Sequence, residues 1–294
     1  MLPFLPGRPV RCSVRLTSVQ SNVYRAYRIG NENRVSDEIE YALDDGVAIV
    51  TINRPEKRNA MTYATLAKFR QAITRAADEP EARAVVITGA GGAFCAGTDL
   101  SDLASVSPEA RGTRGGQDEV PSGWLIQQCP KPVVAAVDGP AVGMGAEFAT
   151  QCDVRIASTT ARFAWNFVHR GLVPDTGAAS WLLPRQIGLT AALRLVLSGE
   201  FLSAGDALAL GYVSAVVEPA AVVQAACAEA RGMSRGSPLA GRLVKELMYA
   251  GLERGIAEHL EHNREALATC FASEDHREGV AAFLERREAR FAGR

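Results

Sequence analysis

Apolar and polar residues follow a regular pattern from residue 38 onward, and this pattern first predicts a hairpin and a helix. Residues 39–52 (IEYALDDGVAIVTI) hold two apolar runs around the turn-forming sequence DDG, which is typical of a β-hairpin. Residues 62–80 carry apolar side chains at helical spacing, with Thr62 as the expected N-cap and Pro80 beyond the end. A helix should therefore follow the hairpin directly.

Short apolar runs, each followed by a glycine-bearing turn, then predict buried strands. They are AVVIT at 84–88 and PVVAAV at 132–137, and further strands are expected at 153–158 and 213–219. Strands that alternate with helices imply an α/β core. Beyond Pro219 the pattern is helical. Helices are expected near 220–234, 238–250, 254–271 and 276–290, and a surface loop at 101–122.

The first 35 residues differ from the rest of the chain. Residues 1–31 hold five arginines and no acid, a composition typical of an organelle transit peptide. Prolines at positions 3, 6 and 9 interrupt any amphipathic helix, which favours a non-core extension of a bacterial protein. We therefore divide the chain into an extension (1–35), a core (36–219) and a C-terminal helical region (220–294). The expected location is the cytoplasm, or an organelle matrix if the extension is a transit peptide.

The composition excludes several classes of protein. The formal net charge of −1 offers no broad basic surface, so we expect no nucleic-acid partner. No apolar run reaches the roughly 18–20 residues that span a bilayer, so we expect no membrane partner. The six cysteines form no CxxC pair and are expected to be reduced. His259 and His262 lie without an HExxH pattern or cysteine ligands, so we expect no metal.

Glycine-rich turns follow two of the predicted strands. In the first, GAFCAGTDL (92–100), a dinucleotide fingerprint starting at Gly89 fails because Phe94 stands where a glycine is needed, and no P-loop lysine follows. Two interpretations stand for this turn: a close approach of ligand to main-chain N–H groups, or a strand exit without a ligand. The second turn lies in VDGPAVGMGAEFATQCD (137–153) and leads into a helix. Together the two turns are able to give one N–H donor each to a single oxyanion.

Six segments, taken in order, resemble the enoyl-CoA hydratase/isomerase family, the crotonase superfamily, over residues 38–291. The segments are 51–62, 92–100, 138–158, 171–188, 203–219 and 274–291. The resemblance implies an α/β fold, namely a crotonase-like spiral of β-β-α units with a C-terminal helical trimerisation region. It also implies an acyl-CoA thioester substrate, assembly as a homotrimer or homohexamer, and no cofactor, because coenzyme A is part of the substrate.

The same resemblance assigns the binding residues. It implies that the main-chain N–H groups of Thr98 and Met144 form the oxyanion hole. It places Lys57 and Arg58 near the CoA phosphates and Ala60 beside the pocket. Without the resemblance, the alternative is that the two cations are ordinary surface charges. The other residues expected to contact the substrate are Ala96, Gly97, Asp99, Leu100 and Phe167.

Two carboxylates are the candidate proton carriers. Glu147 falls on the first of the two glutamate positions of the family's hydratases, but Phe167 occupies the second. Asp175 stands eight residues later, where it resembles the base of the dienoyl-CoA and ring-enoyl-CoA isomerase branches. Apolar surroundings should raise the pKa of Glu147. The structural alternatives are that Glu147 is an acid favoured by the first turn of a helix and that Asp175 is an N-cap.

These residues favour double-bond isomerisation, with hydration as the competing reaction. Replacing a water-holding carboxylate by Phe167 removes a hydrogen-bond acceptor and makes the pocket drier. The alternative function is a non-catalytic acyl-CoA-binding or scaffold member of the same fold. Cys95 is expected to be a packing residue rather than a nucleophile, because no histidine lies near it in the sequence.

Overall fold

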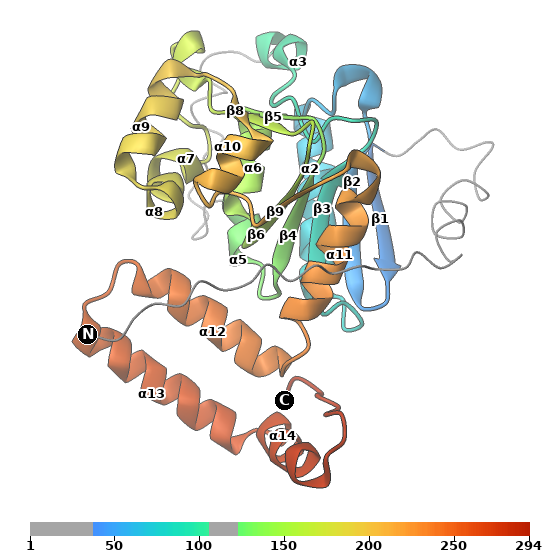
Figure 1. Cartoon of the computed structure of the whole chain (residues 1–294), viewed down its shortest axis with the longest axis vertical. Coiled ribbons are helices and arrows are strands. Elements are labelled where there is room, and N and C mark those ends of the chain that lie inside the picture. The colour runs from blue at the N-terminus through green and yellow to red at the C-terminus, as the bar shows by residue number, and fades with distance from the viewer. Residues whose placement is uncertain (1–37, 106–122) are drawn as a thin grey trace, which may run out of the picture. The chain divides into compact units, whose positions relative to one another are not determined.

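The structure is a computed structural model that describes residues 38–105 and 123–294 (Figure 1). The predicted extension at 1–35 and residues 106–122 of the predicted loop lie outside these residues. The described strands form a six-stranded sheet in the order β1-β2-β3-β4-β6-β9 and a three-stranded sheet in the order β5-β7-β8. Their bounds are β1 Ile39–Asp44, β2 Val47–Ile52, β3 Ala84–Gly89, β4 Val133–Val137, β5 Pro140–Val142, β6 Val154–Ser158, β7 Arg162–Ala164, β8 Leu202–Ser203 and β9 Ala215–Val217.

Helices connect most of the strands, and further helices follow the last described strand. The helices of the core are η2 Pro55–Lys57, α2 Tyr63–Asp78, α3 Leu100–Ser105, α5 Leu125–Gln128, α6 Met144–Gln151, η3 Phe167–Arg170, α7 Ala178–Trp181, α8 Leu183–Ile187, α9 Leu189–Ser198 and α10 Ala204–Ala209. After β9 come η4 Pro219–Ala221, α11 Val222–Met233, α12 Pro238–Gly251, α13 Ile256–Ala272 and α14 Glu274–Glu285. The predicted α/β class is confirmed.

The predicted hairpin is the antiparallel start of the large sheet. β1 pairs with β2 through the turn at Asp45 and Gly46, whose φ angles of 45° and 76° match the left-handed turn that suits strand twist. The other pairings in this sheet, from β2 to β9, are parallel. The predicted helix start is also confirmed, because the Thr62 side chain accepts a hydrogen bond from the Thr65 N–H at 3.0 Å.

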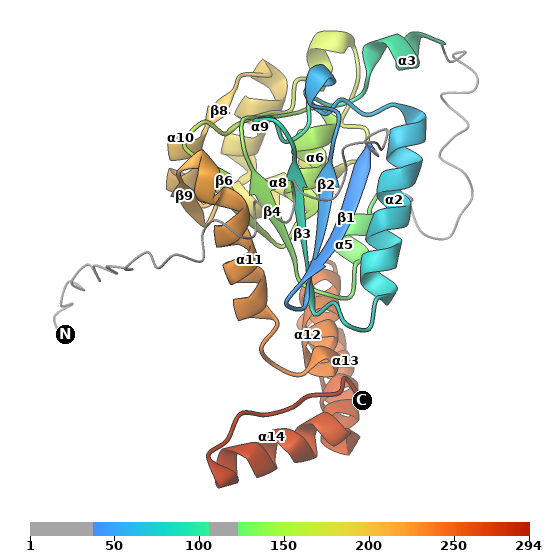
Figure 2. The same cartoon turned by 90° about the vertical axis from the view of Figure 1, so that its right-hand side faces the viewer.

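Helices cover both faces of the large sheet, with α11 on one side and α2 on the other (Figure 2). Alternate residues of each strand point to opposite faces. Ile49 belongs to the apolar cluster that includes Ala226 of α11, whereas its neighbour Val50 belongs to the cluster that includes Phe69 of α2. Because α11 packs on the sheet, packing alone does not separate it from the core, and the division at residue 219 stays a prediction.

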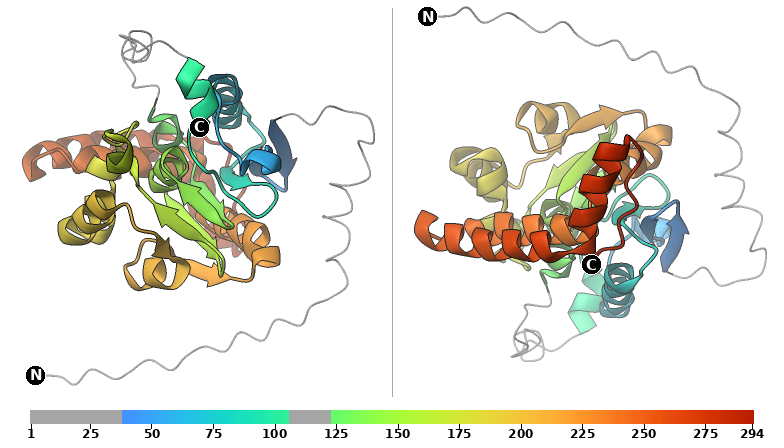
Figure 3. Two further views of the ribbon diagram at one scale, coloured as in Figure 1. Left: turned by 90° about the horizontal axis from the view of Figure 1, so that it is seen from above. Right: turned by 90° about the horizontal axis from the view of Figure 1, so that it is seen from below.

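The helices α12 and α13 run beside each other and α14 follows them (Figure 3). Neither α12 nor α13 contains a buried residue. An ion pair of 2.7 Å joins Lys245 of α12 to Asp153, and the Tyr249 hydroxyl donates to the same carboxylate at 2.8 Å. Large apolar side chains are exposed along the three helices. They are Val244, Met248, Leu252, Ile256, Leu260, Leu267, Phe271, Val280, Phe283 and Leu284.

The structure corrects two predicted boundaries. Residues 101–105, expected in a loop, belong to α3, where the Ser101 N–H donates to the Asp99 carboxylate at 3.1 Å. The last helix, expected at 276–290, ends at Glu285 because Arg286 adopts a left-handed φ of 55°. A search of the described residues finds no helix long and apolar enough to cross a bilayer.

Candidate active site

The turns that follow β3 and β4 lie against each other. The Cys95 N–H donates to the Pro140 carbonyl at 3.1 Å, and the Val142 N–H donates to the Cys95 carbonyl at 2.9 Å. At Gly145 an added Cβ would lie 2.2 Å from the Cys95 carbonyl oxygen, so only glycine allows this approach. The sheet therefore brings together the two glycine-bearing turns that the sequence singled out.

Gly97 and Thr98 carry the first turn to the start of α6. Gly97 has a left-handed φ of 95°, and a Cβ on it would lie 3.5 Å from the Met144 nitrogen. Thr98 bridges to Met61, which donates to the Gly97 carbonyl and accepts from the Asp99 N–H, both at 2.8 Å. This pattern turns the Thr98 N–H away from Met61.

The candidate oxyanion donors are both available for a ligand. Met144 is the first residue of α6, and its N-cap Gly143 offers no side-chain acceptor. Among the described residues, neither the Thr98 N–H nor the Met144 N–H donates a hydrogen bond to the protein. Helix-start N–H groups without a partner favour a negatively charged oxygen.

The segment predicted to contact CoA lies beside the first turn. Lys57 and Arg58 are exposed, and Arg58 has a left-handed φ of 49°. The Arg58 carbonyl accepts from the Ala96 N–H at 3.0 Å. The buried Asn59 side chain donates to the Ala93 carbonyl at 2.6 Å and fixes the segment further. The chain therefore holds two exposed cations next to the candidate oxyanion turn.

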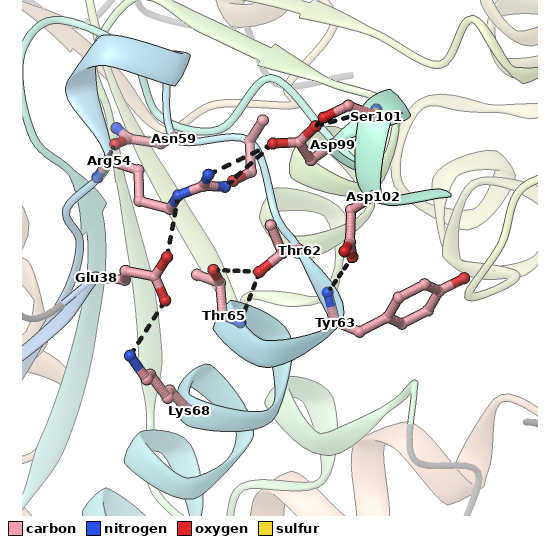
Figure 4. A network of polar contacts seen from close by, with 11 residues as sticks. Glu38, Arg54, Asn59, Thr62, Tyr63, Thr65, Lys68, Asp99, Ser101 and Asp102 are labelled. Atoms are coloured by element: carbon pink, nitrogen blue, oxygen red, sulfur yellow. Dashed lines mark hydrogen bonds and ion pairs between the residues drawn. The ribbon is translucent and has the colours of Figure 1, made fainter. Parts of the chain in front are cut away.

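A polar network that the sequence did not reveal joins these two segments (Figure 4). Arg54 donates to the Ala60 carbonyl and lies 3.4 Å from the Asp99 carboxylate. Asp99 also accepts from the Ser101 hydroxyl at 2.6 Å. The side chain of Asp99, predicted to contact substrate, is therefore engaged by protein, whereas Leu100 is exposed. The only sequence signal for Arg54 was its place within the family-like segment 51–62.

Glu147 is fully buried, and its carboxylate is surrounded by donors. Its Oε2 accepts from the Thr176 hydroxyl at 2.5 Å, the Thr176 N–H at 3.3 Å and the Ala178 N–H at 3.0 Å, and its Oε1 accepts from the Ala179 N–H at 2.7 Å. Burial raises the pKa of Glu147 to about 7, the Thr176 hydroxyl opposes this, and repulsion from Asp175 adds to it. The predicted upward shift is confirmed.

This arrangement changes the structural interpretation of both carboxylates. Glu147 lies in the first turn of α6, but its side chain caps the start of α7 instead, where Ala178 and Ala179 offer free N–H groups. Asp175 is not the N-cap of that helix, because Gly177 occupies the position. The structural alternative of an N-cap at residue 175 is therefore wrong, and Glu147 binds the free N–H groups of this helix start from a distant part of the chain.

Asp175 is the accessible carboxylate of the pair. Its residue is exposed, yet enough protein surrounds the carboxyl group that desolvation raises its pKa to about 6, against hydrogen bonds from the main chain at residues 175 and 176. Its negative charge acts on both Glu147 and Cys95, so the three groups lie near one another. A carboxyl group with a pKa of about 6 is suited to accept and return a proton near neutral pH.

Apolar groups complete the surroundings. Phe167 is 7 % exposed, and a Cβ on Gly143 would lie 3.9 Å from its ring. The ring therefore stands next to the N-cap of α6, close to the Met144 N–H. Burial raises the pKa of Cys95 to about 12, which keeps it a neutral thiol and agrees with a packing role.

The fold and the paired turns define a member of the crotonase superfamily. A family model described as enoyl-CoA hydratase/isomerase matches residues 42–294, and the chain belongs to that family. The resemblance found in the sequence is thereby confirmed, together with the crotonase-like fold. The family match also identifies the chain as an enzyme of the enoyl-CoA hydratase/isomerase type.

Its relatives are named as hydratases. It is 38 % identical over 256 residues to a probable enoyl-CoA hydratase of Rhodobacter capsulatus, covering 87 % of this chain and 98 % of that one. It is 35 % identical over 243 residues to a short-chain-enoyl-CoA hydratase of Clostridium acetobutylicum, covering 82 % and 92 %. The crystal structure of an enoyl-CoA hydratase from Bacillus anthracis matches with a TM-score of 0.82 at 30 % identity, covering 88 % of this chain and all of that one (100 %).

Proposed function

We propose that this enzyme moves the double bond of an enoyl-CoA thioester by transferring one proton with Asp175. The thioester oxygen accepts hydrogen bonds from the N–H groups of Thr98 and Met144. Asp175 removes a proton from the α-carbon, negative charge spreads to the thioester oxygen as the dienolate forms, and the proton returns at the γ-carbon. The observation that carries this proposal is the contrast between two carboxylates, one accessible and one saturated with donors.

The oxyanion step rests on two donors that no group within residues 38–105 and 123–294 uses. Removing one donor from such a site typically costs about 2.7–4 kcal/mol of barrier. Both donors are main-chain groups on rigid turns, so they need no reorganisation as charge develops on the thioester oxygen. Their position between the turns of β3 and β4 supports a single bound oxygen.

The different roles that we propose for Glu147 and Asp175 follow from their hydrogen bonds. Glu147 meets four donors within residues 176–179 and is fully buried, which supports a role in holding Asp175 in position. The earlier expectation that Glu147 itself moves the proton stays a prediction. Thr176, the residue that follows Asp175, donates two hydrogen bonds to Glu147 through its N–H and its hydroxyl. These bonds fix the main chain next to the carboxylate that carries the proton.

Isomerisation and hydration place different demands on the site. A 1,3-proton transfer needs one base on one face of the substrate, whereas water addition needs groups that hold and activate a water molecule. Phe167 supplies no acceptor, and Glu147 has no accessible surface. These features favour isomerisation, while the names of the relatives favour hydration, which is the competing function.

Binding and assembly belong to the same proposal. Lys57 and Arg58 are the proposed contacts to the CoA phosphates, with Ala60, Ala96 and Gly97 lining the approach to the thioester. We also propose that copies of the chain assemble through α12–α14, as a trimer or hexamer. The exposed apolar side chains of these helices, such as Phe283 at 81 % exposure, support this assembly because water-exposed aromatic clusters are unfavourable.

The test is an assay on two substrates of equal chain length. A 3-enoyl-CoA should be converted to the 2-enoyl-CoA, and in deuterated water the γ-carbon of the product should gain deuterium to the extent that the proton on Asp175 exchanges with solvent. A 2-enoyl-CoA should be hydrated more slowly, as followed by formation of the 3-hydroxyacyl product. Fast hydration without double-bond migration would establish the hydratase instead. Tight binding of both thioesters without turnover would support the non-catalytic acyl-CoA-binding alternative.

A further inference from the structure

We propose that Arg54 is a positioning residue that holds the oxyanion donor Thr98 in register with the CoA-binding segment. The inference rests on the proposed function, because it assigns Thr98 to the thioester oxygen. It concerns a side chain whose described contacts are with Ala60, Asp99 and Glu38, and it follows from the contacts drawn in Figure 4.

The guanidinium of Arg54 uses its nitrogens on three separate parts of the chain. Nη1 donates to the carbonyl of Ala60, at the end of the CoA-binding segment. Nη2 and Nη1 lie 3.4 Å and 3.5 Å from Oδ2 of Asp99, the residue after Thr98. Nε lies 3.3 Å from Oε1 of Glu38 at the edge of the sheet. One planar guanidinium group therefore contacts both the CoA-binding segment and the oxyanion turn.

Asp99 passes this restraint to the Thr98 N–H. Its own N–H is bonded to the Met61 carbonyl at 2.8 Å, its Oδ1 accepts from Ser101, and its Oδ2 faces Arg54. The Thr98 N–H itself belongs to the preceding peptide, whose Gly97 carbonyl accepts from the Met61 N–H at 2.8 Å, so both peptides that flank Thr98 are bonded to Met61. Arg54 ties Ala60, the residue before Met61, to Asp99, the residue after Thr98, and so holds together the two segments that the Met61–Thr98 bridge joins.

Burial gives the contact its strength. The side chains of Arg54 and Asp99 are each 12 % exposed, so solvent screens the pair less than a surface ion pair. The Glu38 pair with Lys68 on the outer side is different, since Lys68 is 48 % exposed. Lys68 therefore belongs to the same network but not to the link between the two binding segments.

A lysine cannot replace the guanidinium group of Arg54. Its ammonium is a single point charge, whereas arginine offers donors in a fixed planar arrangement. An Arg54→Lys variant keeps the charge and loses the simultaneous contact to Ala60 and Asp99. This variant separates position from charge, and Lys68→Met serves as the matched control that removes a cation from the outer part of the network.

The readout must report on the oxyanion donor alone. A saturated acyl-CoA thioester and the matching S-alkyl-CoA thioether share coenzyme A and chain length, but only the thioester has a carbonyl oxygen. Titration calorimetry with each ligand gives the preference for the thioester, and deuterium exchange at the α-carbon gives kcat. Thermal unfolding of every variant monitors the fold.

For Arg54→Lys we expect the preference for the thioester to fall about tenfold and kcat for exchange to fall about 10- to 100-fold, with thioether affinity little changed. Lys68→Met should match the wild type. If Arg54→Lys does not fold, Asp99→Asn gives the second test, because it keeps Oδ1 for Ser101 and removes the acceptor facing Arg54. If the preference for the thioester is unchanged, or if both ligands bind more weakly by the same factor, the role proposed for Arg54 is wrong but the proposed function stands. A wild type without thioester preference or exchange overturns the proposed function as well.

Discussion

The hydroxyl of Thr176 donates to Oε2 of Glu147 at 2.5 Å, across 29 residues of sequence. This contact, with those from Ala178 and Ala179, makes Glu147 the cap of a helix that begins three residues after Asp175. A buried carboxylate that accepts from four donors fixes the chain around it. The position of the proposed base therefore depends on a residue whose side chain is fully buried.

Glu147→Gln tests this dependence. The amide keeps one acceptor oxygen but turns an NH₂ group toward N–H donors, so we expect a loss of about 1–3 kcal/mol in the free energy of unfolding at acidic pH. We also expect about a tenfold fall in kcat. Urea denaturation at about pH 5 and steady-state kinetics measure the two effects. A variant as stable and active as the wild type would show that the capping contacts do not position Asp175.

The raised pKa of Glu147 predicts how stability changes with pH. Its folded pKa of about 7 lies above the ordinary value of 4.5, so the folded state binds this proton more tightly than the unfolded state. The stability that Glu147 contributes is complete below the unfolded pKa and is lost as pH rises through about 7. Relative to Glu147→Gln, the wild type should therefore lose stability between about pH 5 and about pH 8. A constant difference between the two proteins would contradict the shift.

Asp175→Asn should remove the proposed base without changing the shape of the side chain. General-base catalysis contributes typically 10²- to 10⁴-fold, so we expect isomerase kcat to fall by about that factor. Asp206→Asn is the matched control, because Asp206 is an exposed acid in the first turn of another helix. If Asp175→Asn lost less than about threefold while Asp206→Asn matched the wild type, the base would lie elsewhere.

The pH profile of the wild type should carry the signature of Asp175. Its pKa of about 6 predicts that kcat/KM rises with pH and levels off above about pH 7, because the base acts only when ionised. Since Asp175 and Glu147 interact, the inflection belongs to the pair, with the first proton lost near the lower value. An inflection near 4, the usual range of an aspartate, would exclude this assignment.

Phe167 is the residue that we expect to decide between the two reactions. Phe167→Glu restores a carboxylate beside Gly143 and should raise the ratio of hydration to isomerisation, at some loss of stability because a charge enters a mostly buried site. Phe167→Leu keeps the position apolar and should leave the ratio low. Product analysis by liquid chromatography gives both rates. Equal ratios in the two variants would show that residue 167 does not decide between hydration and isomerisation.

Assembly can be tested on α14. Phe283→Glu places a charge on the exposed apolar surface and should shift the protein toward smaller species in sedimentation velocity. Gln71→Glu adds the same charge to an exposed position of α2 and should leave the mass unchanged. A wild type that sediments as a monomer at micromolar concentration would contradict the proposed trimer or hexamer.

Local sequence patterns predicted the elements whose causes are local. The DDG turn between β1 and β2, the Thr62 cap of α2 and the four C-terminal helices all follow from residues within one or two turns of chain. The small sheet did not follow, because β5, β7 and β8 have only two or three residues each and show no alternation. Their pairing comes from tertiary packing instead.

The site shows the same limit. The two glycine-bearing turns are visible in the sequence because a buried strand precedes each one. The partners of Glu147 and the Asp99 partner of Arg54 are not visible, since they lie 29–32 and 45 residues away and depend on how distant turns meet. Sequence reasoning therefore named Glu147 and Asp175 as candidates, but its structural alternative placed the cap of α7 at Asp175, whereas the structure supplies it from Glu147.

The contact of Gly145 with the Cys95 carbonyl has a practical result for protein engineering. The Cys95 carbonyl oxygen limits the spacing of the two turns at Gly145, and the proposed donor of Thr98 is a main-chain group, so we expect the Thr98 side chain to tolerate change, whereas Met144 packs against the apolar core. A library that randomises Thr98 should therefore retain turnover in many members while the range of accepted acyl groups changes, whereas a library at Gly145 should yield almost no active clones.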